Sequence, residues 1–458
     1  MDAREPASHS ACVRRTSRGD PGRRVARTRV DPWRKNYLTV WTALFTTSMG
    51  LMAFLPVLTI YVGERFGIVD PIELTFWGSV VYGAAPLTAA VAGPLWGALG
   101  DRVGKKAMAV RANLAISLTT AFMPLAPSVG MLLFLRMLQG GLAGYVAPAM
   151  ALVAQDAPPS RQGRTIASLQ AAMALGSGIG PLVGSEITLL YGRHAVLWFT
   201  SIATGLAGLV LLRYATETQR PKPTQGVSFF AEFARACREL FGSRLFVALL
   251  LLILGLRLGQ NMLEPFVALF VRELGAPAFV EAASSSSREA VERTIGAAFT
   301  VLAVAQVAFT PWWGRASDRY GPLRCLAALA LVLGLVLCAT ARVDGIGSFL
   351  TLRSVSACFM AGSMTLAYAA VSRRIAQERR TFAFSLVQSC MQFGFAIGPW
   401  IGGLVARVGA TPERANLRLP FLVAGVLCLC SGVGMLFLRR RWVAKQRASA
   451  DALTAPPL

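Results

Sequence analysis

The residues best suited to chemistry in this sequence are charged and amide side chains inside a long apolar run. Four of them share one helical face, at i, i+3, i+4 and i+7 within the run from Leu245 to Val271: Arg257, Gln260, Asn261 and Glu264. Charged side chains inside a membrane are costly and face a bundle interior or a water-filled cavity. The spacing therefore predicts a polar cavity beside one membrane helix.

Glu264 is the candidate for moving protons. A buried carboxylate can bind a proton on one side of a membrane and release it on the other, which couples transport to a proton gradient. The alternative is a permanent ion pair between Glu264 and Arg257 that only holds helices together. No acid lies between Tyr37 and Glu64 in the first apolar run, and Glu186 is expected at a solvated interface.

Two arginines occupy equivalent places in the two halves of the chain. Gln139 follows Arg136 by three residues, and Met360 follows Arg353 by seven, about two helical turns. We expect all four side chains to line the same cavity. Methionine surfaces adapt to varied apolar ligands, but methionine also fills gaps in membrane helices, so Met360 is either a lining residue or a packing residue.

Membrane helices must carry these residues. The composition is 54% hydrophobic and 15% charged, whereas a soluble domain has about 25% charged residues. Apolar runs of about 20 residues, long enough to cross a hydrocarbon core of about 30 Å, occur at twelve places. The chain is therefore expected to be an all-α membrane protein with twelve transmembrane helices.

A polar turn between apolar runs occurs twice in the chain. Asp101 and Asp318 are 217 residues apart, as are Arg136 and Arg353. The first copy contains Gly97, Asp101, Arg102, Gly104, Lys105 and Lys106, and the second contains Gly314, Asp318, Arg319 and Gly321. Two parallel repeats predict two six-helix bundles related by a pseudo-two-fold axis, the architecture of an alternating-access carrier.

The duplicated turn suits a gate at one membrane face. Gly97 and Gly104 permit a tight turn, Asp101 can cap a helix N-terminus, and the cations can reach carboxylates or lipid phosphates. An ordinary short loop is the alternative, which the second copy disfavours.

Glycines recur every four residues in two of the runs. The first set is Gly176, Gly180 and Gly184 with Pro181, and the second is Gly398 and Gly402 with Pro399. Such a face allows close approach of a neighbouring helix, and proline permits a bend. The pattern fits either a hinge or static packing.

Basic residues predict the orientation, because short cytoplasmic loops are rich in Lys and Arg. One assignment places every lysine on one face, with both chain ends: Lys35, Lys105, Lys106, Lys222 and Lys445. The expected divisions are a basic tail at 1–36, a bundle at 37–212, a cytoplasmic linker at 213–244, a bundle at 245–441 and a tail at 442–458. The linker is expected to contain an interfacial helix at Phe229 to Phe233, and the outer loop from Gly275 to Arg293 is expected to be exposed, without recognisable chemistry.

Several classes of function are disfavoured. The net charge of +23 follows mostly from topology, so nucleic-acid binding need not be invoked. Two histidines and eight dispersed cysteines give no metal set, and no phosphate loop or paired catalytic acids occur, so we expect no metal, no cofactor and no enzyme activity. The basic tail either binds anionic lipids or is a disordered segment.

The motifs resemble those of the major facilitator superfamily, within its twelve-helix drug/proton antiporters. The resemblance rests on the turn from Gly97 to Lys106, on Arg136 with Gly140, and on the motif from Gly176 to Gly184, whose usual final glycine is Ser185 here. It covers nearly everything from Trp33 to Arg441. Residues 32–36 and 271–274 look like the MdtG-type exporters in particular.

The resemblance implies a carrier in a bacterial inner membrane that exports amphipathic organic compounds in exchange for protons. The alternative on the same fold is an exporter of one metabolite, sugar or siderophore. The expected partners are a small-molecule substrate, protons and membrane lipids. We expect a monomer, although no sequence pattern reports on assembly.

Overall fold

The chain folds into helices wherever the computed structural model describes it, which is at residues 32–156, 158, 162–217, 238, 242–372, 380–410 and 415–454. No strand occurs within these residues. A helix satisfies every interior backbone hydrogen bond within its own segment, as a chain in lipid requires. The basic tail up to residue 31 and the expected interfacial helix of the linker lie outside the described residues.

Ten helical segments form the first half of the described chain. They are α1 (Pro32–Phe54), η1 (Leu55–Val57), α2 (Leu58–Phe66), α3 (Pro71–Val103), α4 (Lys105–Phe122), η2 (Met123–Leu125), α5 (Val129–Leu142), α6 (Val146–Asp156), α7 (Gln162–Tyr191) and α8 (Arg193–Tyr214).

The second half has the same organisation with a longer connection between its first two spans. Its helices are α10 (Arg244–Asn261), α11 (Glu264–Leu274), α12 (Ala278–Ala282), α13 (Ser287–Tyr320), α14 (Pro322–Thr340), α15 (Ile346–Met360), α16 (Ser363–Ser372), α17 (Arg380–Val405) and α18 (Arg418–Thr454). The helix α18 continues to Thr454, well into the segment that we expected as a tail.

The lengths of these helices fit a membrane. Ten segments within the described residues are long and apolar enough to cross a bilayer. The short apolar helix α5 is continued by α6 beyond Gly144, whose φ of +104° favours glycine, and α17 is the remaining long helix. The expected all-α fold with twelve crossing segments is confirmed.

Matched hydrogen bonds show the internal repeat directly. The indole Nε1 of Trp96 donates to the carbonyl of Gly141 over 2.6 Å, and that of Trp313 donates to the carbonyl of Cys358 over 2.9 Å. Each donor and acceptor are 45 residues apart. The same contact is therefore built twice, once in each half.

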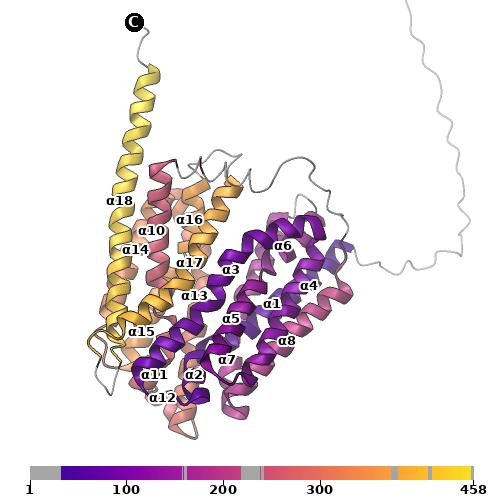
Figure 1. The fold of residues 1–458 in the computed structure, drawn as a ribbon. Helices are drawn as coiled ribbons and strands as arrows, with labels where there is room; N and C mark the ends of the chain where they lie inside the picture. The colour runs from indigo at the N-terminus through magenta and orange to yellow at the C-terminus, as the bar shows by residue number, and fades with distance from the viewer. Residues whose placement is uncertain are drawn as a thin grey trace, which may run out of the picture.

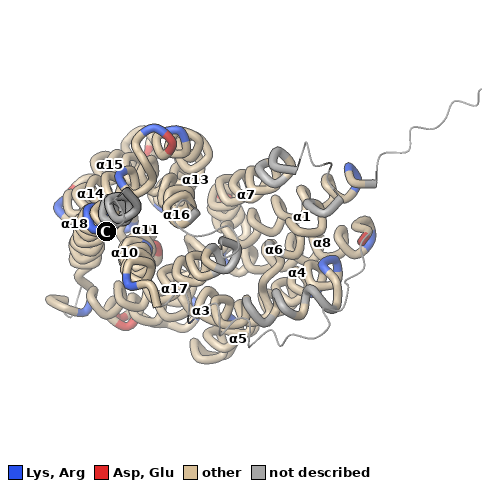
Figure 2. The backbone as a smooth tube through the Cα atoms, turned by 90° about the horizontal axis from the view of Figure 1, so that it is seen from above, with Lys and Arg blue, Asp and Glu red and all other residues tan. Residues whose placement is uncertain are grey.

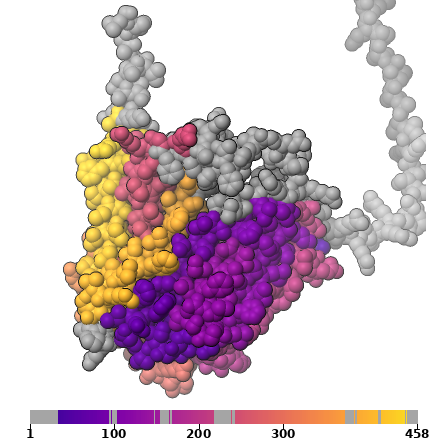
Figure 3. Space-filling view, viewed as in Figure 1, coloured from indigo at the N-terminus to yellow at the C-terminus, as the bar shows by residue number. Residues whose placement is uncertain are grey.

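The halves meet most extensively along two pairs of helices. In the view from above, α3 lies beside α17 and α7 lies beside α13 (Figure 2). Trp400 Nε1 donates to the Val80 carbonyl over 3.1 Å across the first pair, and Thr300 Oγ1 donates to the Gly178 carbonyl over 2.9 Å across the second. The space-filling view shows the two halves in contact on one face of the molecule (Figure 3).

The two ends of the bundle are distinct. The helix α1 begins and α18 ends on one side, which we call the terminal face, and α12 lies on the other, which we call the α12 face (Figure 1). The positions of the charged side chains are given relative to these two faces.

Candidate transport site and gates

A buried ion pair lies at the centre of the second half. Arg353 Nη2 on α15 is 3.2 Å from Glu264 Oε2, and each side chain is 7% exposed. Arg353 Nε also donates to the Ala298 carbonyl over 3.1 Å, and its guanidinium lies over the Phe299 ring at 5.2 Å. Glu264 begins α11 with Pro265 beside it, so the carboxylate also lies at the positive end of a helix.

Glu264 pairs with Arg353 and not with Arg257, the partner in the alternative interpretation. The helix breaks after Asn261, and Glu264 begins a new helix, so the four polar residues do not share one continuous face. Arg257 Nη1 donates to Gln260 Oε1 over 2.9 Å, and Asn261 Nδ2 donates back to the Arg257 carbonyl over 2.8 Å. The break places Glu264 against α15 instead of α10.

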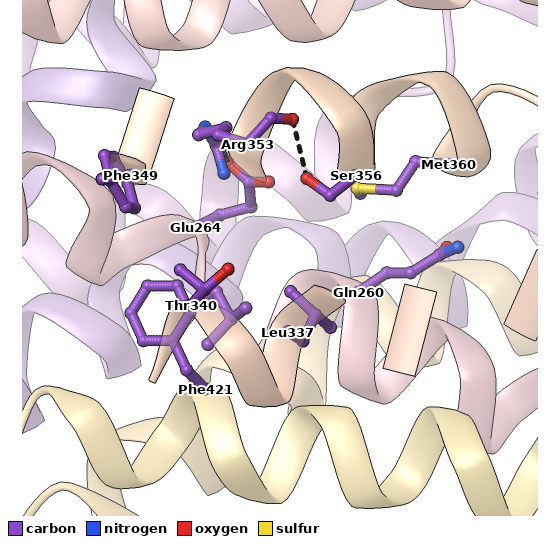
Figure 4. Close-up of a pocket in the computed structure, with 10 residues that line it drawn as sticks. Gln260, Glu264, Leu337, Thr340, Phe349, Arg353, Ser356, Met360 and Phe421 are labelled. Atoms are coloured by element: carbon purple, nitrogen blue, oxygen red, sulfur yellow. Dashed lines mark hydrogen bonds and ion pairs between the residues drawn. The ribbon is translucent and has the colours of Figure 1, made fainter. Parts of the chain in front are cut away.

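A small cavity adjoins the ion pair (Figure 4). Its volume of about 10 Å³ is close to the minimum that one buried water needs. Gln260, Glu264, Arg353 and Met360 line it together with residues that the sequence did not single out as liners: Leu263, Leu337, Thr340, Phe349, Ser356 and Phe421. All of them belong to the second half, so this cavity is inside one bundle and Arg136 and Gln139 do not line it.

The equivalent arginine of the first half has a different environment. Arg136, 3% exposed, donates from Nε to the Val81 carbonyl over 3.2 Å and from Nη2 to the Tyr82 carbonyl over 3.2 Å. Its Nη1 donates to Gln139 Oε1 over 2.5 Å, and Gln139 Nε2 donates to the Thr120 hydroxyl over 2.7 Å. Among the described residues no carboxylate contacts Arg136.

The position that corresponds to Glu264 in the first half is Thr47, 217 residues earlier. Thr47 is fully buried, and its hydroxyl donates to Asn113 Oδ1 over 2.6 Å. A neutral pair thus replaces the carboxylate.

The duplicated turns are shorter than expected. Gly97, Asp101 and Arg102 lie within α3, and Gly314, Asp318 and Arg319 lie within α13, so Gly97 is not part of the turn and Asp101 does not precede α4 as its cap. The turns themselves are made at Gly104 and Gly321, with φ of +112° and +89°. The side chains of Asp101 and Arg102 are outside the described set.

The start of the linker is attached to the first turn. Glu217 accepts hydrogen bonds from the backbone N–H groups of Lys105 over 2.7 Å and Lys106 over 3.3 Å, the first residues of α4. A Cβ on Gly104 would lie 2.7 Å from Glu217 Oε2, so the glycine leaves room for this carboxylate. Sequence reasoning missed Glu217.

The glycine motifs pack as predicted. In α7, a Cβ on Gly176, Gly180 or Gly184 would collide with backbone oxygens of α1, at 2.5 Å from the Met49 oxygen for Gly180. In α17, a Cβ on Gly398 would lie 2.9 Å from the Leu258 oxygen of α10, and one on Gly402 would lie 2.5 Å from the Met262 oxygen. Pro181 and Pro399 each lie inside a continuous helix. Their role as hinges stays a prediction.

Four charged residues form a cluster on the α12 face. Arg193, which begins α8, contacts Glu64 of α2 at 2.5 Å and also pairs with Glu292 of α13. Arg272 of α11 lies 3.3 Å from Glu64 and 3.7 Å from Glu292. Two members come from each half, so the cluster joins the halves.

This cluster corrects the expectation for the segment from Gly275 to Arg293. Glu292 is only 1% exposed, whereas we expected an exposed segment without chemistry. The sequence around Glu292 does not distinguish it from Glu289, one turn earlier. Glu292 meets Arg193 of the other half, and this contact is not visible in the local sequence. Glu186 is half exposed and lies 3.2 Å from Arg293, which agrees with the expected interfacial position.

Two repeated bundles of membrane helices, with buried charges and glycine-packed contacts between spans, define a membrane transporter. A family model described as Major Facilitator Superfamily matches residues 40–288 and 289–456, and the chain belongs to this family. The resemblance identified from the motifs is confirmed.

The chain is also similar in sequence to multidrug resistance proteins. The chain is 28% identical over 387 residues to the multidrug resistance protein MdtG of Proteus mirabilis (strain HI4320), covering 82% of this chain and 90% of that protein. It is 28% identical over 415 residues to MdtG of Escherichia coli (strain SMS-3-5 / SECEC), covering 89% and 96%.

Solved structures show the same fold at low identity. A crystal structure of the nucleoside transporter NupG has a TM-score of 0.72 at 12% identity, covering 88% of this chain and 98% of that one. An inward-facing, unoccupied bacterial homologue of the human lysosomal transporter Spinster has a TM-score of 0.72 at 15% identity, covering 90% and 98%. These similarities concern the fold alone.

Proposed function

We propose that this transporter exports amphipathic organic compounds in exchange for protons by alternating access. The observation that carries the proposal is the buried pair of Glu264 and Arg353 beside a water-sized cavity. The similarity to MdtG multidrug resistance proteins supports the substrate class. The halves at 37–212 and 245–441 are the units that rock against each other.

Glu264 is the proton carrier in this mechanism. As a carboxylate it pairs with Arg353; when protonated it becomes neutral, and Arg353 keeps its hydrogen bond to Ala298. One proton moving down a potential of about 100 mV supplies about 2.3 kcal/mol, enough for roughly fiftyfold accumulation of a substrate if exchange is electrogenic. Arg136, Arg257 and Asn261 are proposed to contact substrate elsewhere in the path between the halves.

The orientation is part of the proposal. Lys35 lies near the start of α1, which begins on the terminal face, and its ammonium lies over Tyr214 at the end of α8. Lys105 and Lys106 donate backbone hydrogen bonds to Glu217, which follows α8. The terminal face is therefore assigned to the cytoplasm of a bacterial inner membrane and the α12 face to the outside. A cysteine introduced at Phe279, which is 76% exposed on α12, should react with an impermeant thiol reagent added to intact cells, while one at Tyr214, at the end of α8, should not. The reverse labelling would overturn the orientation.

The function is tested by transport in vesicles that contain the purified protein. With an imposed pH gradient, several chemically diverse dyes should be accumulated, and collapse of the gradient should stop accumulation. Accumulation of one metabolite, sugar or siderophore without dyes would select the alternative exporter, and accumulation without dependence on the gradient would contradict proton antiport.

A further inference from the structure

We propose that Glu292 is a second proton-binding site, on the α12 face, and that its protonation opens this face by releasing Arg193. This inference rests on the proposed orientation and extends the proposed function, in which Glu264 alone carries protons. It concerns the cluster of Glu64, Arg193, Arg272 and Glu292, which we call the outer latch.

The outer latch is a balanced set of charges between the halves. Glu64 and Arg193 belong to the first half, and Arg272 and Glu292 belong to the second. Arg193 and Glu292 are 3% and 1% exposed, so their contact is shielded from water. Opening the α12 face must separate Arg193 from Glu292. Arg193 then keeps only Glu64, and Glu292 keeps only Arg272 at 3.7 Å, so loss of the buried contact favours the closed face.

Glu292 differs from Glu64 in one respect that points to proton binding. Both oxygens of Glu64 contact an arginine, and its side chain is 49% exposed. Glu292 meets arginines through Oε1, whereas its buried Oε2 has no hydrogen-bond partner among the described residues. A proton can therefore be added at Oε2 without displacing an existing donor.

An open recess lies beside Glu292 on the α12 face. Its volume is about 360 Å³, and Glu292 lines it together with Arg272, Ser287, Arg288 and Val291. The proton comes from the outer solution, binds Oε2 and converts the carboxylate to a neutral acid. Two arginines then face the single carboxylate of Glu64, so the latch changes from neutral to a net charge of +1 and its arginines repel each other.

Other ionisable groups surround Glu292 on the elements that pack near it. They are Tyr61, Glu64 and Arg65 within α2, Glu186 and Tyr191 on α7, Arg193 and His194 on α8, Arg272 and Glu273 on α11, and Arg288, Glu289 and Arg293 on α13. Among these, His194 is the group that ordinarily titrates near neutral pH. It is exposed, and its ring packs edge-on against Tyr61 at 5.2 Å. His194 is therefore the rival explanation for any response to acid.

The test measures opening of the α12 face without measuring transport. Spin labels are placed at Val69 and Phe279, which are exposed in opposite halves, after the native cysteines have been replaced by serine. Distance distributions are recorded in lipid nanodiscs between about pH 7.5 and about pH 4, a range that includes the usual pKa of glutamate. The fraction at long distance should rise severalfold on acidification.

Single-residue variants show which side chain causes the change in distance on acidification. Glu292→Gln should give the long distance at every pH, with no further change on acidification. His194→Gln should behave like the parent, as should Asp344→Asn, which removes an exposed ion pair with Arg418 inside one half. If Glu292→Gln folds poorly, Glu64→Gln should open the face in part and keep the response to acid, because Glu292 remains.

Three results would overturn the proposal: no change in the parent distances with pH, a pH response that persists in Glu292→Gln, or one that disappears only in His194→Gln. Glu264→Gln should leave the response unchanged. Failure of proton antiport and failure of the latch are therefore distinguishable, since each concerns a different carboxylate and a different readout.

Discussion

The two halves share a scaffold and differ in their charge chemistry. Arg136 and Arg353 are equivalent, and each donates from Nε to a carbonyl 55 residues earlier in the chain, Val81 or Ala298. Beyond this shared bond, Arg353 meets a carboxylate and Arg136 meets neutral oxygens. Both copies of the repeat thus hold a buried arginine by the same backbone hydrogen bond, but only the second copy pairs it with a carboxylate.

The turns at the terminal face differ in the same manner. In the first half, Glu217 accepts from the N–H groups that begin α4. In the second, Pro322 follows Gly321 at the start of α14, and proline has no N–H at this position. A carboxylate therefore accepts from the first N–H groups of α4, whereas α14 begins with a proline, which has no N–H that needs an acceptor.

The comparison predicts the largest difference for the two arginines. Arg353→Gln leaves Glu264 as a buried charge without its partner, which should cost about 3 to 5 kcal/mol of stability. Arg136→Gln strands no charge and should cost about 1 to 3 kcal/mol, from lost hydrogen bonds. Thermal unfolding of the purified variants measures both.

A double variant makes this test sharper. Arg353→Gln combined with Glu264→Gln should recover much of the loss, because no charge is then unpaired. Equal losses for the two single variants, with no recovery in the double variant, would show that the halves are energetically alike.

A smaller difference is expected where helices pack through glycine. Gly180→Ala places a Cβ at 2.5 Å from a backbone oxygen of α1, whereas Gly398→Ala places one at 2.9 Å from a backbone oxygen of α10. Overpacking costs about 1 to 3 kcal/mol, and the loss should be greater for Gly180. Gly93→Ala, with open space around its Cβ, is the matched control and should be neutral or stabilising. A loss at Gly398 as large as at Gly180 would contradict the difference in packing.

The smallest effect is expected at the first turn. Glu217→Gln replaces a charged acceptor with a neutral one at the N-terminus of α4, which should cost about 0.3 to 1 kcal/mol. Hydrogen exchange at Lys105 and Lys106 should increase, while the turn at Gly321 should be unaffected. Unchanged protection at the two lysines would show that the carboxylate does not hold this turn.

The sequence predicted the parts of the fold that depend on periodicity and on the repeat. Apolar runs of membrane length and the equivalence of Arg136 with Arg353 require no knowledge of tertiary contacts. Four members of the expected cavity set, Gln260, Glu264, Arg353 and Met360, line one small cavity, whereas Arg136, Gln139, Arg257 and Asn261 do not line it. Sequence reasoning nevertheless treated Glu264 as part of an unbroken helix. The signal was present, because an acid followed by proline is typical of a helix start.

Other features could not be predicted from local sequence. Arg193 and Glu292 are ordinary polar residues near helix ends, and their burial depends on contact between the two halves, where α7 packs against α13 and Arg193 meets Glu292. Glu217 follows a membrane helix and precedes a polar linker, so its contact with Gly104 depends on how the chain returns to the first turn. Contacts between distant segments determine these sites.

The central claim is that Glu264 carries protons, and efflux compared with exchange in one preparation of Glu264→Gln tests it most directly. Loss of gradient-driven efflux with survival of substrate exchange at equal pH is the predicted result, because exchange needs alternation of the loaded carrier but no net proton movement. Asp344→Asn is the control and should retain both activities. Full gradient-driven efflux by Glu264→Gln would contradict the claim, and an equal loss of efflux and exchange, with a lower folded yield, would assign Glu264 and Arg353 a structural role instead.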